Sequence, residues 1–376
     1  MKLFMRLLIC CLFFVSLSLS VAAQNMQPRL PAASYEPADT NALYLSLSNA
    51  NFLKNNEFFN DYVSGYTKLG FLFKPELSYA FTRKTKLSAG AHFLKYSGSD
   101  HFQEITPVFT LQHQLARHVD LVMGTLNNER NHHLIDPIYH FENYLNRHVE
   151  NGLQFLIDYP ALQGDVWINW QQFIPEGANF HEQFEAGVTA DVALTGNSRP
   201  LSVHIPFQLL VQHKGGQVNQ LDEPISTLYN MASGISLGMR PKTGLVDKIT
   251  LRNLLALYQD GSPQKLQPFD QGHAIYSSLI LKRKKLSLEM SYWNALQFLS
   301  FSGNPLFQAY SMKKSSVLDA RREMIVGRLN FSQKYRHLQL FINVDSYYDV
   351  QNASFDFGFG FYLLLNTSIL LHEGSQ

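Results

Sequence analysis

The feature that most constrains this chain is an alternation of apolar and polar residues that begins near residue 42 and recurs to about residue 371. In the stretch FDFGFGF at 355–361, every second residue is phenylalanine, and Asp356 and glycines lie between. Side chains of a β-strand point alternately to its two faces, so each such segment predicts a strand with one apolar face. We count about sixteen segments (roughly 14–18) and expect an all-β fold.

Alternation alone does not separate a membrane barrel from a two-sheet sandwich, because both hide one face of each strand. The connections do separate them, since long and short ones alternate along the chain. The short ones are TRKTK, ARH, PALQG, TGNSRP, PKTGLVD, KRKK and KYRH, and the long ones are 51–69, 98–103, 127–149, 174–182, 214–224, 260–272, 294–320 and 349–353. Short periplasmic turns and long extracellular loops are typical of outer-membrane barrels. We therefore expect a transmembrane antiparallel β-barrel.

The N-terminus has the features of an export signal. Lys2 and Arg6 precede an apolar run that ends near Val21, which predicts a signal peptide over 1–23. A linker rich in Pro and Ala is expected over 24–41, and the barrel over 42–371. Both cysteines, Cys10 and Cys11, lie in the signal peptide, so the mature chain would have no disulfide and no thiolate metal site.

The composition after the signal peptide favours a membrane barrel. No apolar run there reaches the roughly 18 residues of a membrane-spanning helix. Yet 45% of residues are hydrophobic, 13% are aromatic and only 16% are charged, whereas soluble domains have about 25% charged residues. Removing two cations from 31 Lys+Arg, against 30 Asp+Glu, changes the formal charge from +1 to −1. This balance argues against a nucleic-acid partner.

The alternation also assigns side chains to two faces. The apolar face carries no charge in the proposed strands, as expected for a wall where Lys or Arg costs ~2–4 kcal/mol at the bilayer midplane. The opposite face carries the predicted pore-lining residues: Glu76, Asp120, Asp165, Glu185, Asp191, Arg252, Glu289, Arg322, Arg328, Asp345 and Asp356. Acids outnumber bases among them, so a weak preference for cations is expected.

A signal peptide, about sixteen alternating strands and the aromatic final segment resemble bacterial outer-membrane barrels of the porin type. The resemblance implies a location in the bacterial outer membrane, contact with its lipid, and passive or weakly selective passage of small polar solutes. One alternative is a non-enzymatic subunit or accessory of an outer-membrane secretion or uptake complex. Another is a channel for hydrophobic substrates. The sequence departs from many such barrels by continuing past FYLLL into NTSILLHEGSQ.

Two long loops are candidates for function. The segment 293–310 is unusually apolar, so it must be buried in the lumen as a constriction, against a partner protein, or on a hydrophobic ligand. Its aromatic residues are Trp293, Phe298, Phe301, Phe307 and Tyr310. The loop 127–149 contains His132, His133, His140 and His148. Their irregular spacing matches no recognised metal motif, so we interpret them as polar residues of a solvated loop and predict no metal.

Catalysis would require a nucleophile or an activated water, with a histidine oriented by an acid or an amide. The sequence shows no Ser-His pairing and no paired-Asp motif above chance, and His92 and His204 are predicted to face the lumen. The sequence therefore predicts a barrel that is not an enzyme, has no catalytic residue and needs no cofactor.

Overall fold

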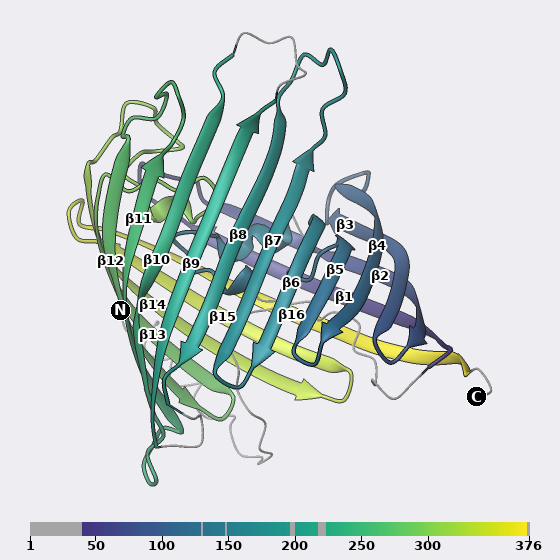
Figure 1. The fold of residues 1–376 in the computed structure, drawn as a ribbon. Coiled ribbons are helices and arrows are strands. Elements are labelled where there is room, and N and C mark those ends of the chain that lie inside the picture. Colours follow the sequence, from purple (N-terminus) through teal and green to yellow (C-terminus); the bar gives the residue numbers. More distant parts are fainter. Residues whose placement is uncertain (1–39, 129–130, 147–148, 196–199, 217–222, 374–376) are drawn as a thin grey trace.

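The computed structural model describes residues 40–128, 131–146, 149–195, 200–216 and 223–373. They form one closed antiparallel barrel in which each strand pairs with its neighbours in sequence and β1 pairs with β16 (Figure 1). The strands are β1 Ala42–Glu57, β2 Tyr66–Thr82, β3 Thr85–Tyr96, β4 Glu104–Ala116, β5 Val119–Thr125, β6 Asn151–Tyr159, β7 Leu162–Gln172, β8 Glu182–Ala193, β9 Leu201–Gly215, β10 Ser226–Met239, β11 Lys248–Asp260, β12 Gln271–Arg283, β13 Leu286–Leu296, β14 Arg321–Tyr335, β15 Leu338–Asp349 and β16 Ser354–Glu373. The predicted barrel and its strand number are confirmed.

In the described part of the chain, helical structure is confined to short 3₁₀ segments in the loops: η1 Asn131–His133, η2 Phe141–Leu145 and η3 Pro305–Phe307. Within the described ranges, no helix has the length and apolar character needed to cross a membrane. The predicted signal peptide lies outside the described residues, as does the predicted linker up to residue 39.

The two faces of the wall follow the alternation in the sequence. Phe355 and Phe361 of β16 are 54% and 46% exposed on the outward face, whereas Asp356 between them is 2% exposed on the inward face. Buried residues likewise alternate with partly buried or exposed ones along β1 and most of β15. Because apolar side chains on the outward face can only contact lipid, the rings of the final strand form part of the lipid-facing wall.

Short and long connections alternate around the barrel, so one end carries the turns and the other the loops. We call the end with the turns the turn end; it contains 83–84, 117–118, 160–161, 284–285 and 336–337. We call the opposite end the loop end. The predicted loop 51–69 is too long, because β1 continues to Glu57 and β2 begins at Tyr66. Alternation continues through this asparagine-rich stretch, so its backbone keeps pairing with β2 and β16.

The last strand continues beyond its neighbour on one side. β15 pairs with β16 only as far as Leu338 opposite Leu365, whereas β1 pairs with β16 as far as Ala42 opposite Glu373. The residues that follow FYLLL therefore continue the closing strand. They end at the turn end of the barrel, next to the start of β1 (Figure 1).

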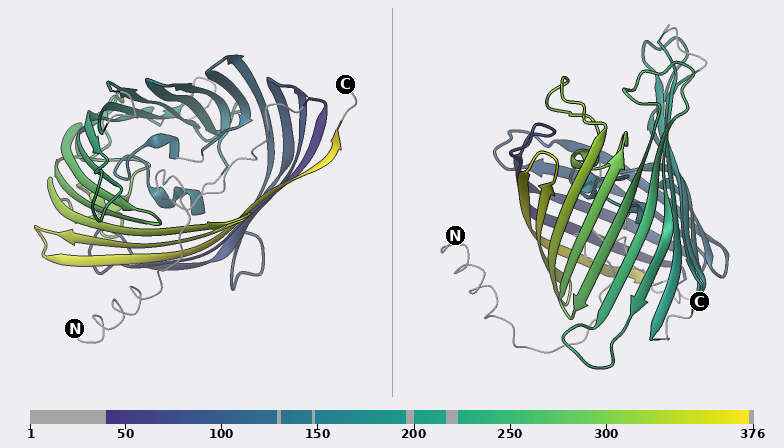
Figure 2. Two further views of the ribbon diagram at one scale, coloured as in Figure 1. Left: turned by 90° about the horizontal axis from the view of Figure 1, so that it is seen from below. Right: turned by 90° about the vertical axis from the view of Figure 1, so that its left-hand side faces the viewer.

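The lumen is filled by parts of the long connections. Viewed along the axis, the short helical segments lie inside the ring of strands (Figure 2). A buried apolar cluster joins the loop residues Leu134, Ile138 and Phe307 to the strand residues Trp293 and Tyr347. This barrel therefore has a packed centre over the part of its height where the loops fold inward.

Candidate functional site

Two loops, 126–150 and 297–320, meet inside the lumen. Tyr139 and Ser302 form a parallel β-bridge, and the backbone N–H of His140 donates to the carbonyl of Ser302 at 2.8 Å. The backbone N–H of Asn304 donates to the carbonyl of Asp136 at 2.9 Å, and the Asn304 side chain donates to the Asp136 carboxylate at 3.0 Å. These bonds satisfy backbone groups that would otherwise be buried without partners.

The structure places the aromatic loop in the lumen. Trp293, Phe298 and Phe307 are fully buried with ring centroids 5.0–5.4 Å apart around Trp293, and its indole N–H donates to the carbonyl of Phe307 at 3.1 Å. Phe301 is half-buried and Tyr310 is exposed. Edge-to-face packing of this kind favours one fixed arrangement.

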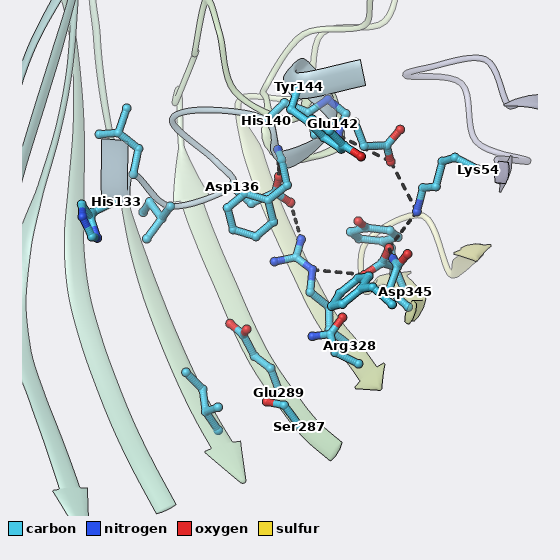
Figure 3. A pocket seen from close by; sticks show the side chains of 18 of the residues that line it. Lys54, His133, Asp136, His140, Glu142, Tyr144, Ser287, Glu289, Arg328 and Asp345 are labelled. Carbon is cyan, nitrogen blue, oxygen red and sulfur yellow. Dashed lines mark hydrogen bonds and ion pairs between the residues drawn. The ribbon is translucent and has the colours of Figure 1, made fainter. Parts of the chain in front are cut away.

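A chain of opposite charges anchors the 126–150 loop to the wall (Figure 3). Arg328 of β14 pairs with Asp136 of the loop, and its Nε lies 3.3 Å from Asp345 of β15. Lys54 of β1 bridges Asp345 at 2.9 Å and Glu142 of η2 at 3.4 Å. Buried charges are tolerated only when they are paired in this way, so the network holds the loop in one position.

Glu142 remains a carboxylate despite its burial. Burial alone would raise the pKa of Glu142, but Lys54 and His140, together with hydrogen bonds from Tyr66 and Asn56, lower it below its usual value. The amide of Asn56 donates to the carboxylate at 3.0 Å. The inward-facing side chains of β1 and β2 are therefore organised around this loop residue.

A polar cavity of about 130 Å³ adjoins the network. Asp136, Glu142 and Arg328 lie along its upper side, and Ser287 and Glu289 of β13 lie below them toward the turn end (Figure 3). A water molecule occupies about 30 Å³ of liquid volume, so the cavity holds a few waters or one small solute.

His132 is buried, so the interpretation of the histidines in this loop as solvated polar residues is wrong for it. Its ring is 1% exposed, with Nδ1 2.8 Å from Asp165 of β7 and Nε2 2.6 Å from Glu150. It also stacks on Trp167 at 3.9 Å between centroids. Burial alone would lower the pKa of His132, but the carboxylates of Glu150 and Asp165 outweigh burial and raise it to about 10. The imidazolium is thus a buried cation that fastens the loop.

The structure brings no metal-ligating cluster together from the other histidines. Within the described ranges, no group of three or more His, Cys, Asp and Glu side chains has the arrangement of a metal site. His140 lies 3.9 Å from Glu142, and His148 lies outside the described residues.

All of the predicted pore-lining residues lie on strands, with their side chains on the inward face. Several contact a loop instead of open space. Arg322 pairs with Asp349 and stacks its guanidinium 3.6 Å from the Tyr62 ring, and Asp356 accepts a hydrogen bond from the backbone N–H of Phe59 at 2.6 Å. Glu185 accepts one from Ser302. The residues placed in this way on the inward face are Glu76, Asp120, Asp165, Glu185, Asp191, Arg252, Glu289, Arg322, Arg328, Asp345 and Asp356.

Sequence reasoning missed polar side chains on the lipid-facing wall. We call Asn49, Asn51, Asn55, Glu57 and Thr67 the outer-wall polar group; they share the outward face of β1 and β2 with lipid-facing leucines. The Thr67 hydroxyl donates to Asn55 Oδ1 at 2.5 Å, and the Asn55 amide donates to Glu57 at 2.8 Å. The Asn51 amide donates to Asn49 at 2.6 Å. Following the alternation of β1 past Ala50 would have placed these amides on that face.

Phenylalanines and one lysine flank this group. Phe71 lies opposite Asn51 across the β1–β2 pair, and Lys95 of β3 lies opposite Phe71. The rings of Phe71 and Phe93 lie 6.3 and 5.7 Å from that of Phe102. The Lys95 ammonium is 5.8 Å from the Phe102 ring and donates to the carbonyl of Ser99 at 2.5 Å. The outer wall therefore combines an apolar surface with amides, a hydroxyl, a carboxylate and a cation near the loop end.

A second pair on the outward face has a different chemistry. His213 Nδ1 lies 2.9 Å from the hydroxyl of Thr227 at the loop end of β9 and β10. Phe184 packs on the His213 ring at 5.1 Å and on Trp170 at 5.4 Å. A hydroxyl next to an imidazole combines the groups of a nucleophile and its base.

Comparison with solved structures shows the fold alone. OprD of Pseudomonas aeruginosa aligns with a TM-score of 0.51 at 10% identity, over 92% of this chain and 98% of that one. OpdK of Pseudomonas aeruginosa gives 0.52 at 10% identity, over 88% and 100%. A loop-deletion mutant of OmpT, an outer membrane protein of Vibrio cholerae, gives 0.51 at 10% identity, over 86% and 99%. The barrel is thus porin-like and of the outer-membrane type.

The sequence itself matches a family of enzymes. The model of the lipid A 3′-O-deacylase-type family matches residues 35–374. No curated protein matches the sequence. The expectation that this barrel is not an enzyme is therefore wrong.

Proposed function

The chain belongs to the lipid A 3′-O-deacylase-type family, and from this premise we propose that it hydrolyses an ester-linked acyl chain of a lipid A-type glycolipid. The observation that carries the proposal is the outer-wall polar group. A membrane lipid lies outside the barrel, so groups that act on it must project from the outward face. Polar side chains on such a wall are costly and commonly mark function.

The hydrogen bonds of the group suggest roles for its members. Glu57 is the carboxylate of the group, so it would accept the proton of the attacking water. Asn55 and Thr67 contact each other beside Glu57 and would donate hydrogen bonds to the ester oxygen as negative charge develops on it. In the free protein Thr67 donates to Asn55 and the Asn55 amide donates to Glu57, and substrate would replace those bonds.

The surroundings of the group fit an acylated anionic lipid. The rings of Phe71, Phe93 and Phe102 provide an apolar surface for an acyl chain. Lys95 lies at the end of the same surface and would contact a negatively charged headgroup.

The experiment measures release of fatty acid from purified lipid A by the full chain in detergent, with the products identified by mass spectrometry. Glu57→Gln should lower the rate at least 100-fold. The matched control is Glu323→Gln, because Glu323 is also outward-facing near the loop end and accepts a hydrogen bond from Tyr292 at 2.8 Å. Equal losses in both variants would contradict the assigned site. A loss confined to His213→Ala would move the site to the His213–Thr227 pair.

Passage of small solutes through the lumen is a second candidate, favoured by the polar cavity beside the charge network. Planar-bilayer recordings test it directly. A steady current from the refolded protein would support passage, and silence at all voltages would exclude it.

A further inference from the structure

The loop end of β2 has only one neighbouring strand. β2 begins at Tyr66, but its pairing with β3 begins only at Gly70. Among the described residues, 66–68 therefore pair with β1 alone, and Tyr66 lies opposite Asn56. A two-stranded ribbon is marginally stable by itself, so this corner of the wall needs support from another element.

One carboxylate of η2 joins both strands from inside the barrel. Glu142 accepts a hydrogen bond from the Tyr66 hydroxyl of β2 and another, at 3.0 Å, from the Asn56 amide of β1. The Lys54 ammonium of β1 lies 3.4 Å from the same carboxylate (Figure 3). Hydrogen bonds to an ionised group are roughly twice as strong as neutral ones, so Glu142 holds β1 and β2 together at this pair.

Two further contacts extend this support to the end of β3. The Lys68 ammonium of β2 donates to the side chain of Asn146, which directly follows η2. The Tyr96 hydroxyl, on the last residue of β3, donates to the carbonyl of Leu145 at 3.1 Å. The segment 142–146 therefore links β1, β2 and β3 where the pairing of β2 with β3 ends.

The residues that η2 contacts alternate with those of the outer-wall polar group. Successive side chains of a strand point to opposite faces, so Asn56 faces the lumen between the outward-facing Asn55 and Glu57. Tyr66 likewise faces inward directly before Thr67. The outer pair of Asn55 and Thr67 is thus the next pair along the strands from the inner pair of Asn56 and Tyr66. Because the two pairs share one stretch of backbone, a shift of the inner pair displaces the outer pair as well.

We propose that Glu142 is a positioning residue that acts through the wall: its contacts with β1 and β2 fix the spacing of the outer-wall polar group on the other face. The inference rests on the proposed function of that group. Glu142 does not contact the lipid substrate, because its side chain lies in the lumen and is 13% exposed. A misplacement of about 1 Å can lower a catalytic rate on the order of 100-fold, so loss of this support slows the chemical step more than it weakens substrate binding.

The test compares variants of the full chain in detergent. Glu142→Ala removes the acceptor, whereas Glu142→Gln keeps an oxygen within reach of Asn56 and Tyr66. Tyr66→Phe removes one donor and keeps the ring. The matched control is Glu289→Ala, because Glu289 is also a lumenal carboxylate beside the cavity but contacts residues of β11, β12 and β13 instead. Heat-modifiable gel mobility confirms that each variant is folded, and Tyr66→Phe carries the test if Glu142→Ala does not fold.

Release of fatty acid from purified lipid A gives kcat and KM. Glu142→Ala should lower kcat at least 10-fold and change KM less than 2-fold, and Tyr66→Phe should lower kcat about 3-fold. Glu142→Gln should stay within about 3-fold of the unmodified protein, and Glu289→Ala within about 2-fold. Backbone amides of 52–57 and 66–69 should exchange with deuterium at least 10-fold faster in Glu142→Ala, and at the unmodified rate in Glu289→Ala.

The inference is overturned if Glu142→Ala keeps its kcat within 2-fold, or if Glu289→Ala loses as much. Unchanged amide exchange in Glu142→Ala would also overturn it. Failure of the proposed function gives a different result, because the unmodified protein would then release no fatty acid. Amide exchange alone would in that case decide whether Glu142 holds this corner of the wall: faster exchange supports it and unchanged exchange refutes it.

Discussion

Replacing His132 by glutamine tests how firmly the 126–150 loop is held inside the barrel. Glutamine keeps hydrogen-bonding atoms near Asp165 and Glu150 but removes the positive charge between them. The carboxylates would then be buried next to each other without a cation. Removing one partner of a buried ion pair costs about 3–5 kcal/mol.

The pKa of His132 gives an independent magnitude. A rise from 6.5 to about 10 corresponds to on the order of 5 kcal/mol. Because the folded-state pKa lies above the unfolded value, this stability is fully present below pH 6.5 and is lost as the pH rises through about 10. Both estimates predict that His132→Gln raises the population of the opened loop on the order of 10²- to 10³-fold at neutral pH.

Limited proteolysis at pH 7 measures the opened loop, and fluorescence follows the pH dependence. The His132 ring stacks on Trp167 at an interplanar angle of 8°, and an imidazolium quenches indole emission. Subtracting the emission of His132→Gln from that of the unmodified protein isolates this site among the three tryptophans. Cleavage of the loop that is no faster in His132→Gln would refute the reasoning. A midpoint below pH 8 for the pH-dependent change in the emission difference would also refute it.

The remaining predictions concern the wall and the charge network. Phe361→Arg places a cation on the lipid-facing surface and should cost ~2–4 kcal/mol of stability near the midplane. Gel electrophoresis with and without heating should show a smaller fraction of folded barrel. The control Phe361→Leu should fold normally, and similar damage from both variants would contradict the assigned face. Arg328→Met leaves Asp136 and Asp345 without this partner and should destabilise the protein by about 3–5 kcal/mol in thermal unfolding. Adding Asp136→Asn should recover part of that loss; no recovery would argue against direct coupling.

The wall was predictable because its signal is local. Every second residue of β16 identifies the outward face before any neighbour is known, and Phe355 and Asp356 lie on the faces that the alternation assigns. The limits of β1 were harder to place, since asparagines at 49, 51 and 55 interrupt the apolar pattern while the backbone continues to pair. Because residues 51–69 were predicted to be a loop, the outward-facing positions of Asn51, Asn55, Glu57 and Thr67 were not predicted.

The lumen was not predictable from local pattern, because its contacts join residues distant in sequence. His132 looks like a loop residue until the register of β7 brings Asp165 to within 2.8 Å. Asp136 likewise depends on Arg328, which is 192 positions away. Periodicity could assign Asp165 and Arg328 to the inward face, but it could not show that a loop would return to meet them.

The pairing of β1 with β16 makes the two ends of the chain mutually dependent. The hydroxyls of Ser46 and Ser368 meet at 3.2 Å although 322 positions separate them. Until the last strand arrives, β1 and β15 each present an open edge, which is a template for pairing with other chains. Contacts of such long sequence separation also slow folding. A chain that still lacks β16 cannot close this barrel, so these two edges must be protected from aggregation until synthesis is complete.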